Sequence, residues 1–369
     1  MKHILIGNGL IIQYGGSDYL NTSIIDRTMA NAKAGHYEDD MKTTISPDET
    51  HQFFVLLRRE IKAVLSGDYD KHAVLKEEKA ALEDFHNRYP HAHMSMKNIG
   101  FEDYFLVLRL LHNKFRETSQ NRYAAKTAMQ RLFLDSIYNG GHINTLYQSF
   151  PCKFVDFLNG YETLFTVNYD TNIENATNRK VFHLHGQFDV LEYVYDPNSL
   201  RNQLPDRPAD RFDIPTEYRH TYCNAIMDFS KDFQVAMLGH ANSALEKLTS
   251  ASSTNPTLLK DVESWEHDSN KMVQNLYHAY KAKTQNPELS FDEYPLSKID
   301  SLNGEMHLLG LSPSNDTHIL QRIRTNEQIE TIHYYYFSEN EKKIMEQFFN
   351  QKTINCSDVR KLWDSFADE

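Results

Sequence analysis

Apolar residues along the chain follow two patterns, short continuous runs and longer stretches with helical spacing. Continuous runs bounded by glycine or polar turn residues are typical of strands that are buried on both faces of a parallel sheet. The first run, His3–Ile6, ends at Gly7-Asn8-Gly9, and the others are Thr163–Val167, Val181–Leu184, Met306–Leu311 and Thr331–Phe337. These runs predict five strands separated by helices.

A long stretch after the first run, from about residue 50 to residue 160, has helical periodicity. Its apolar residues recur at steps of three and four, and the first helix of the stretch is predicted to stop at Gly67. Further amphipathic helices are predicted at Phe101–Phe115 and Ala124–Tyr138, the second ended by Gly140-Gly141. The chain therefore places a large helical insertion after its first strand.

The region between residues 187 and 300 has a mixed pattern. Helices are predicted at Tyr222–Phe229 and Ala241–Leu248. The segment Thr249–Pro256 is rich in Ser and Thr, and it is predicted to be a flexible loop or lid.

The end of the chain returns to the pattern of a strand followed by a helix. Ser338 and Glu341 have the spacing of a capping box for a helix over Asn340–Phe349. Because apolar strands alternate with helices along the chain, we predict an α/β fold with a parallel sheet and helices on both of its faces.

Composition narrows the function classes. The chain has 369 residues, more than one small core needs, with 40% hydrophobic and 24% charged residues. These values are ordinary for a globular protein and exclude a disordered or fibrous chain. Its 39 Lys and Arg against 51 Asp and Glu give a formal net charge of −12, which disfavours general binding to nucleic acid or to an anionic membrane surface.

The cysteines and the first residues indicate the compartment. Cys152, Cys223 and Cys356 are far apart and form no Cys-x-x-Cys pair, so they are predicted to be buried thiols in a reducing compartment. The sequence has no apolar run long enough to span a membrane, and its first residues lead into a strand without a secretory pattern. A cytoplasmic location is therefore expected.

Candidate chemistry lies at the ends of the predicted strands, because ligands of open parallel sheets bind outside the carboxyl ends of the strands. Four such ends carry glycine together with amide, carboxylate, imidazole or hydroxyl groups. They are Gly7-Asn8-Gly9 with Ser17, Asn168-Tyr169-Asp170, His185-Gly186, and Gly310-Leu311-Ser312 with Asp316.

Each of these segments alone also has an ordinary structural explanation. The Gly7/Gly9 pair is either a tight turn or a cradle for pyrophosphate, since its spacing departs from the Gly-x-Gly-x-x-Gly fingerprint. Asn168 and Asp170 either close an Asx turn or bind a ligand. His183 and His185 share one face of a strand, but no further ligand has workable spacing, so we expect no metal there.

Taken together and in this order, the segments resemble the sirtuin-like NAD-binding domain. The matching residues are Gly7-Asn8-Gly9, Thr166–Thr171 with Glu174, Leu184-His185-Gly186, and Gly310-Leu311-Ser312 with Asp316, which lie in segments covering under a quarter of the chain. The resemblance is to bacterial sirtuin-like proteins of anti-phage defence, which destroy cellular NAD.

The resemblance also implies a domain organisation. Residues 1–40, 161–195 and 300–369 would form a discontinuous, Rossmann-type NAD-binding domain, residues 41–160 a helical insertion, and residues 196–299 a helical, loop-rich subdomain. Sirtuin deacylases carry a zinc ribbon with two Cys-x-x-Cys pairs, which three scattered cysteines cannot form. Hydrolysis of NAD+ is therefore favoured over protein deacylation.

Site roles follow from the same resemblance. Asn168 would orient the nicotinamide ribose and the attacking water, Asp170 would hold the nicotinamide end, and His185 would be the general base. Arg27 matches only loosely, because the aromatic residue of the sirtuin loop is missing. The NAD-binding set is Gly7, Asn8 and Gly9 at the phosphates and ribose, Ser312 at the adenosine side, and Ser17, Arg27, Gly186, Gly310 and Asp316.

The implied activity is an NAD+ glycohydrolase that releases nicotinamide and ADP-ribose in abortive-infection-type anti-phage defence, with NAD as substrate and no metal. The leaving group is already cationic, so positioning and one base with a pKa near neutral suffice. A homo-oligomer and a HerA-type ATPase partner are also implied, and this partner would make any contact with DNA. Two alternatives stay open, a sensor or scaffold that binds NAD or ADP-ribose without cleaving it, and a deacylase or ADP-ribosyltransferase.

Overall fold

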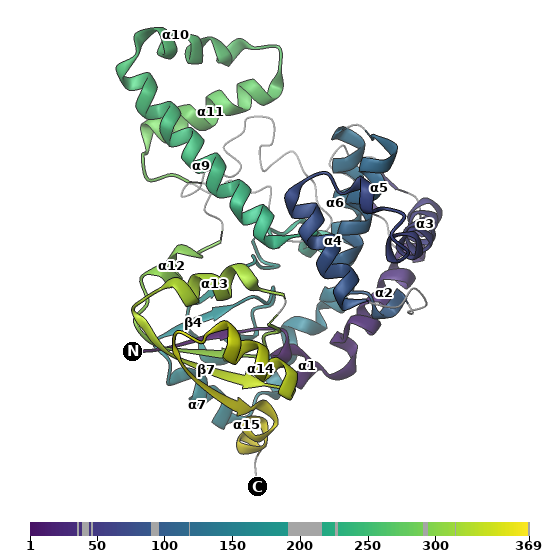
Figure 1. Ribbon diagram of the computed structural model, residues 1–369, viewed down its shortest axis with the longest axis vertical. Helices are drawn as coiled ribbons and strands as arrows, with labels where there is room; N and C mark the ends of the chain where they lie inside the picture. Colours follow the sequence, from purple (N-terminus) through teal and green to yellow (C-terminus); the bar gives the residue numbers. More distant parts are fainter. Residues whose placement is uncertain are drawn as a thin grey trace.

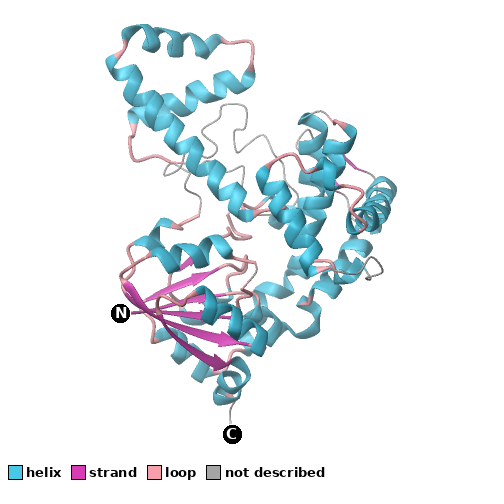
Figure 2. Cartoon of the chain, in the orientation of Figure 1, coloured by secondary structure: helices cyan, strands magenta, loops and turns pink. Residues whose placement is uncertain are grey.

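The central element of the protein is a six-stranded parallel sheet, seen in the computed structural model (Figure 2). The structure describes residues 1–34, 37–38, 44–45, 47–89, 96–117, 119–190, 216–225, 228–290, 294–313 and 315–367. The strands lie in the order β5-β4-β1-β6-β7-β8. Their bounds are β1 Lys2–Ile6, β4 Thr163–Thr166, β5 Val181–His183, β6 Gly304–Leu309, β7 Ile329–Tyr336 and β8 Thr353–Asp358.

All five strands predicted from the apolar runs are present, and the predicted parallel α/β class is confirmed. Numbered along the chain, the strands have the order 3-2-1-4-5-6 of Rossmann-like folds, with the reversal between β1 and β6. β8 was not predicted, because this edge strand alternates exposed and half-buried residues and has only Ile354 and Cys356 as apolar positions. A separate two-stranded sheet pairs β2 Tyr37–Glu38 with β3 Thr44–Ile45.

Helices cover both faces of the sheet, as predicted. In β1, Leu5 packs on one side, while Ile4 and Ile6 pack on the other, as the alternation of a strand requires. The Leu5 side holds α12 Ser297–Asp300, α13 Thr317–Thr325 and α14 Glu339–Phe348. The Ile4 side holds α1 Gly9–Gly15, α7 Cys152–Asn159, α8 Asn172–Thr177 and α15 Val359–Phe366.

A helical block made of α2 to α6 stands beside the sheet and has its own apolar core (Figure 1). The stops predicted at Gly67 and Gly140-Gly141 are confirmed by positive φ angles at these glycines. α2 falls within residues 1–40 but packs on α3 and α6, whereas α7 falls within 41–160 but packs on the sheet. The bounds are α2 Asn21–Ala34, α3 Pro47–Leu65, α4 Lys76–Arg88, α5 Asp103–Phe115 and α6 Ser119–Tyr138.

Three helices form an arm that projects away from the sheet in Figure 1. They are α9 Lys231–Thr254, α10 Pro256–Ser264 and α11 Lys271–Gln285, with a small core around Val262 and Tyr280. The loop or lid predicted at Thr249–Pro256 is wrong, because α9 continues to Thr254 and α10 begins at Pro256. Ser and Thr side chains in this segment donate to helix carbonyls three residues earlier, as Ser253 does to Ser250, so helix satisfies them.

Other local predictions have mixed outcomes. The capping box is confirmed, since Glu341 N donates to Ser338 Oγ at 3.2 Å and Ser338 N donates to Glu341 Oε2 at 3.3 Å. The helix predicted over Tyr222–Phe229 is wrong in its described part, where a 3₁₀ helix ends at Tyr222. The 3₁₀ helices are η1 Gly16–Tyr19, η2 Asp70–His72, η3 Met96–Asn98, η4 Asn139–Ser149, η6 Thr216–Tyr222 and η7 Trp265–His267.

The cysteines are not all buried, contrary to prediction. Cys223 is buried and Cys356 half-buried, but Cys152 is exposed at the start of α7 because its neighbours Phe154 and Leu158 provide that helix's buried face. Within the described residues, no helix combines the length and the apolar character that a bilayer crossing requires.

Candidate functional site

The loops that follow β1, β4, β5 and β6 meet at one edge of the sheet, called here the carboxyl edge. Gly9 N donates to Gly310 O at 2.9 Å, which joins the loops after β1 and β6. Asn168 Nδ2 donates to Gly7 O at 3.2 Å, and His183 Nδ1 donates to Asn168 O at 2.9 Å. Segments as far apart in the sequence as Gly9 and Gly310 are therefore in direct contact, at the point where the strand order reverses.

Glycine at this edge allows two backbones to touch. A Cβ on Gly7 would lie 2.5 Å from Gly310 O, and a Cβ on Gly9 would lie 2.5 Å from Gly310 Cα. Gly310 also has φ +69°, which favours glycine. The N–H groups of Gly7 and Gly9 donate to the carbonyls of Leu309 and Gly310, so these glycines serve loop packing, and Asn8 is the exposed residue of the turn.

Asp170 combines an Asx turn with an unused oxygen. Its Oδ1 accepts from Asn172 N at 3.0 Å and from Asn172 Nδ2 at 2.5 Å, which is the turn that the sequence left open as an alternative. Its Oδ2 is buried and has no hydrogen-bond partner among the described residues. Burial raises the pKa of Asp170 to about 6, although Asn172 and His183 oppose this rise.

His183, the last residue of β5, holds the Asn168 loop in place. Its Nε2 donates to Glu174 Oε1 at 2.6 Å while its Nδ1 donates to the Asn168 carbonyl, so both ring nitrogens carry protons. Burial alone would lower the pKa of His183, but Glu174 and the Asn168 carbonyl raise it above the usual value. A charged imidazolium therefore fixes the backbone of the residue predicted to orient the ribose.

His185 follows β5, the outermost strand on this side of the sheet, and is fully buried. Its Nε2 forms a hydrogen bond with His318 Nε2 at 3.1 Å, and its Nδ1 is 3.8 Å from Asp316 Oδ1 and makes no hydrogen bond to a described residue. Burial, with nearby Lys231 and His318, lowers the pKa of His185 well below its usual value. The ring is therefore neutral at neutral pH, as a general base must be.

A buried ion pair closes this edge from the side of the helical block. Lys231, the first residue of α9, has a side chain only 11% exposed, and its Nζ lies 2.6 Å from Glu102 Oε1. Burial alone would lower the pKa of Lys231, but Glu102 and the nearby Tyr169 and Asp316 raise it, so the ammonium stays charged. No sequence pattern indicated a functional role for Lys231 or His318. Glu102 lies at the start of the helix predicted at Phe101–Phe115, which the structure contains as α5.

The remaining predicted residues have diverse positions. Arg27 donates to the carbonyls of Ser136 and Asp18, at 2.8 and 2.6 Å, and so ties α2 to α6 instead of reaching the strand ends. Ser17 is exposed in η1, and Ser312 is half-buried in the loop after β6. Gly186 has φ +82°, and a Cβ there would lie 2.3 Å from Asn224 O.

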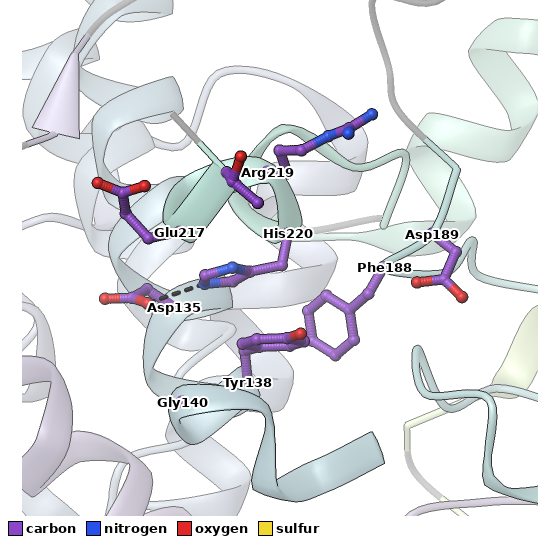
Figure 3. Close-up of a pocket in the computed structure, with 9 residues that line it drawn as sticks. Asp135, Tyr138, Gly140, Phe188, Asp189, Glu217, Arg219 and His220 are labelled. Carbon is purple, nitrogen blue, oxygen red and sulfur yellow. Dashed lines mark hydrogen bonds and ion pairs between the residues drawn. The ribbon is translucent and has the colours of Figure 1, made fainter. Parts of the chain in front are cut away.

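A cavity of about 560 Å³ lies beside the Asn168 loop and was not predicted (Figure 3). The rings of Tyr138 and His220 stack at 3.9 Å on its wall. Phe188 packs edge-on against Tyr138 at 5.2 Å and against Tyr169 at 5.9 Å, so the cavity shares a wall with the Asn168–Asp170 segment. It is lined by Asp135, Tyr138, Gly140, Phe188, Asp189, Thr216, Glu217, Arg219 and His220.

Comparison with protein-family models, with curated proteins and with solved structures finds no match for this chain. The residues at the carboxyl edge and the order of the strands are therefore the features that indicate a function.

Proposed function

We propose that the chain is an NAD+ glycohydrolase with a sirtuin-like NAD-binding domain, which releases nicotinamide and ADP-ribose. One observation carries the proposal: Asn168, Asp170 and His185, far apart in sequence from Gly7 and Gly310, lie with them at the carboxyl edge of a 3-2-1-4-5-6 sheet. Dinucleotides bind at this reversal point in sheets with that strand order.

The residues present suit an NAD substrate. Two buried polar atoms at the edge, Asp170 Oδ2 and His185 Nδ1, have no hydrogen-bond partner among the described residues, and a buried polar group without a partner is costly unless a ligand uses it. The glycines let the loops after β1 and β6 pack directly on each other, which leaves the exposed Asn8 as the residue of this turn that a pyrophosphate would approach.

Hydrolysis of NAD+ requires only positioning of the substrate and one general base. The bond between C1′ of the ribose and the nicotinamide nitrogen breaks, its electron pair leaves with nicotinamide, and the resulting cation is attacked by water. Asn168 would orient the ribose and this water, the Asp170 carboxylate would face the developing positive charge, and neutral His185 would accept the water's proton. The products are nicotinamide, ADP-ribose and one proton.

Burial of His185 also supports control of the activity. The ring is fully buried and paired with His318, so this conformation has to open before a substrate can touch it. Such a closed site suits an enzyme of abortive-infection-type anti-phage defence that stays inactive until a signal arrives. Within the proposal, homo-oligomer formation and a HerA-type ATPase partner would supply the signal.

The same burial is the observation that favours the alternative of a non-catalytic sensor or scaffold. A protein that binds NAD or ADP-ribose without cleaving it has no need to expose a base, and His185 is not exposed here. A deacylase or ADP-ribosyltransferase is less well supported, since three cysteines cannot form the zinc ribbon of sirtuin deacylases.

Incubation of the purified chain with NAD+, alone and with a HerA-type ATPase, separates these functions when nicotinamide release is measured by chromatography. We expect turnover that falls about 10²- to 10⁴-fold in His185→Ala and also falls in Asn168→Ala. His267→Ala, at an exposed histidine of the arm, is the matched control and should retain full turnover. Turnover that survives both site variants would contradict the assignment, and binding without turnover would favour the sensor.

A further inference from the structure

A second cluster of histidine and carboxylate side chains lies away from the carboxyl edge, on the sheet face that carries α7 and α15. Glu305 and His307 are two residues apart on β6 and so share a face, and His333 on β7 is the register partner of His307. Glu305 is the second residue of β6, so the cluster lies toward the start of the strand, whereas the NAD site begins where β6 ends. The two sites are separate.

The distances in this cluster fit a bound ion. Glu305 Oε2 lies 3.3 Å from His333 Nε2 and 3.6 Å from His307 Nε2, and all three atoms are within 4.8 Å of one another. A tetrahedral zinc ion with ligand bonds of ~2.0–2.1 Å separates its ligand atoms by about 3.4 Å. Two of the three separations therefore match those around one shared ion. The rings of His307 and His333 stack in parallel with centroids 4.1 Å apart, so one of them has to tilt before both Nε2 lone pairs point at the ion.

The surroundings of His307 prepare it to be a ligand. Its Nε2 is buried and has no hydrogen-bond partner among the described residues. Its Nδ1 lies 3.0 Å from Tyr161 Oη and 3.2 Å from Tyr335 Oη, and a proton on Nδ1 donated to a phenol oxygen leaves the Nε2 lone pair facing Glu305. Second hydrogen bonds of this kind orient most metal-binding histidines.

We propose that Glu305, His307 and His333 form a binding site for a divalent transition-metal ion of the zinc type. Two imidazoles and one carboxylate are a common protein ligand set for such ions. The side chains of Glu305 and His333 are 38% and 28% exposed, which leaves a path for the ion and a fourth position for water. The bound ion would cross-link β6, which carries Glu305 and His307, to β7, which carries His333. This site does not depend on the proposed NAD chemistry and uses no cysteine.

Two ordinary interactions compete with the ion. His333 Nε2 lies 3.3 Å from Glu305 Oε2 without any metal, and the exposed ammonium of Lys2 lies 3.9 Å from the same oxygen. Because an ion pair at a half-exposed position contributes little free energy, an ion that forms three coordinate bonds displaces it.

The test is zinc titration of the metal-stripped full chain by calorimetry, compared with Glu305→Gln and His333→Ala. Both side chains are half-exposed, so both variants should fold, which circular dichroism checks. We expect the wild-type chain to bind one more equivalent of Zn²⁺ than either variant. If a variant still binds that equivalent, its affinity should be about tenfold or more lower than that of the wild type. His267→Ala, which removes a histidine elsewhere in a chain that has 18, should behave as the wild type.

Two further readouts make the result decisive. Co²⁺ bound at the site should have the intense visible absorption of a tetrahedral ion, and this should vanish in His333→Ala. Excess Zn²⁺ should raise the Tm of the wild-type chain, because it binds only the folded state, and should not raise the Tm of Glu305→Gln. Equal zinc stoichiometry and affinity in the wild type and both variants, or absence of tight zinc binding to the wild type, would overturn the proposal.

Discussion

The carboxyl edge of the sheet and the arm formed by α9 to α11 are both rich in polar side chains, but they differ in whether the buried polar atoms have hydrogen-bond partners. At the edge, Asp170 Oδ2 and His185 Nδ1 are buried without a hydrogen-bond partner among the described residues. In the arm, residues 231–290 contain no such atom wherever side chains are described, and Ser252 donates to the Thr249 carbonyl at 3.1 Å. The buried polar side-chain atoms described in the arm all have hydrogen-bond partners, whereas the edge contains two that have none.

This difference indicates where a ligand would act. A buried polar group without a partner costs about 1–3 kcal/mol, and proteins keep few of them outside functional sites. Two such atoms lie after the adjacent strands β4 and β5. A bound ligand that forms hydrogen bonds with them would recover this free energy. The arm has no comparable cost, so the same comparison predicts that substitutions will affect stability and activity differently in the two regions.

The largest effect is expected from Gly310→Ala at the edge. Its backbone has φ +69°, and an added Cβ would lie 2.9 Å from Gly9 Cα, so strain and overpacking together should lower the free energy of unfolding by about 2–4 kcal/mol. Urea denaturation measures this change. Gly239→Ala, inside α9 with nothing within 4 Å of the new Cβ, is the matched control.

The control should change stability in the opposite direction. Alanine in a helix interior is favoured over glycine by about 0.5–1 kcal/mol, so Gly239→Ala should stabilise the chain slightly. If Gly310→Ala were as stable as Gly239→Ala, the backbones of the two edge loops would not be in contact as described, and the comparison between edge and arm would fail.

A pH effect of about 2–3 kcal/mol is expected at Asp170. Its pKa is about 6 in the folded protein and 3.8 as the ordinary value, so the folded state binds more protons than the unfolded state between these values. Stability from this carboxyl is therefore present at low pH and is lost as pH rises from about 4 to 6. Asp170→Asn stays neutral, so its stability relative to the wild type should increase over that range.

Urea denaturation of both proteins at several pH values between 4 and 7 measures this difference. Asn172→Ala removes a side-chain amide that donates to Asp170 Oδ1, so it should raise the pKa of Asp170 further. The loss of stability with rising pH should then occur at higher pH in this variant than in the wild type. If the free energy of unfolding of Asp170→Asn instead decreased relative to that of the wild type as pH rises, the folded protein would stabilise Asp170 as a carboxylate and the prediction would be wrong. NAD+ turnover should fall in Asp170→Asn although the variant is more stable at neutral pH.

Local features of the fold could be predicted from the sequence because their causes are local. The apolar run before Gly7, the helix stop at Gly67 and the capping box of Ser338 and Glu341 each depend on a few neighbouring residues. The position of the candidate site followed from the rule that loops at the carboxyl ends of parallel strands meet. β8 gave no such signal, since an edge strand with one half-buried face has few apolar residues.

Contacts between distant segments could not be predicted. The ion pair of Lys231 with Glu102 forms only because α9 begins where the helical block meets the edge, and nothing around either residue marks it. The pairing of His333 with Glu305 likewise requires the register of β6 with β7. The error at Thr249–Pro256 has a different origin, because Ser and Thr favour turns on average but can also donate to helix carbonyls.

The smallest effect is expected in the arm, at Ser252. Its hydroxyl is buried and lies 2.9 Å from Tyr280 Oη, so Ser252→Ala leaves that phenol short of a hydrogen bond. The better helix propensity of alanine offsets part of this loss, and the net destabilisation should be about 1 kcal/mol. Ser253→Ala, exposed and bonded only to the Ser250 carbonyl, should be neutral or slightly stabilising. Hydrogen exchange localised to α9 and α11 measures both, and NAD+ turnover should stay unchanged. Equal exchange in the two variants would mean that the arm does not depend on satisfied polar contacts, and its contrast with the carboxyl edge would lose its physical basis.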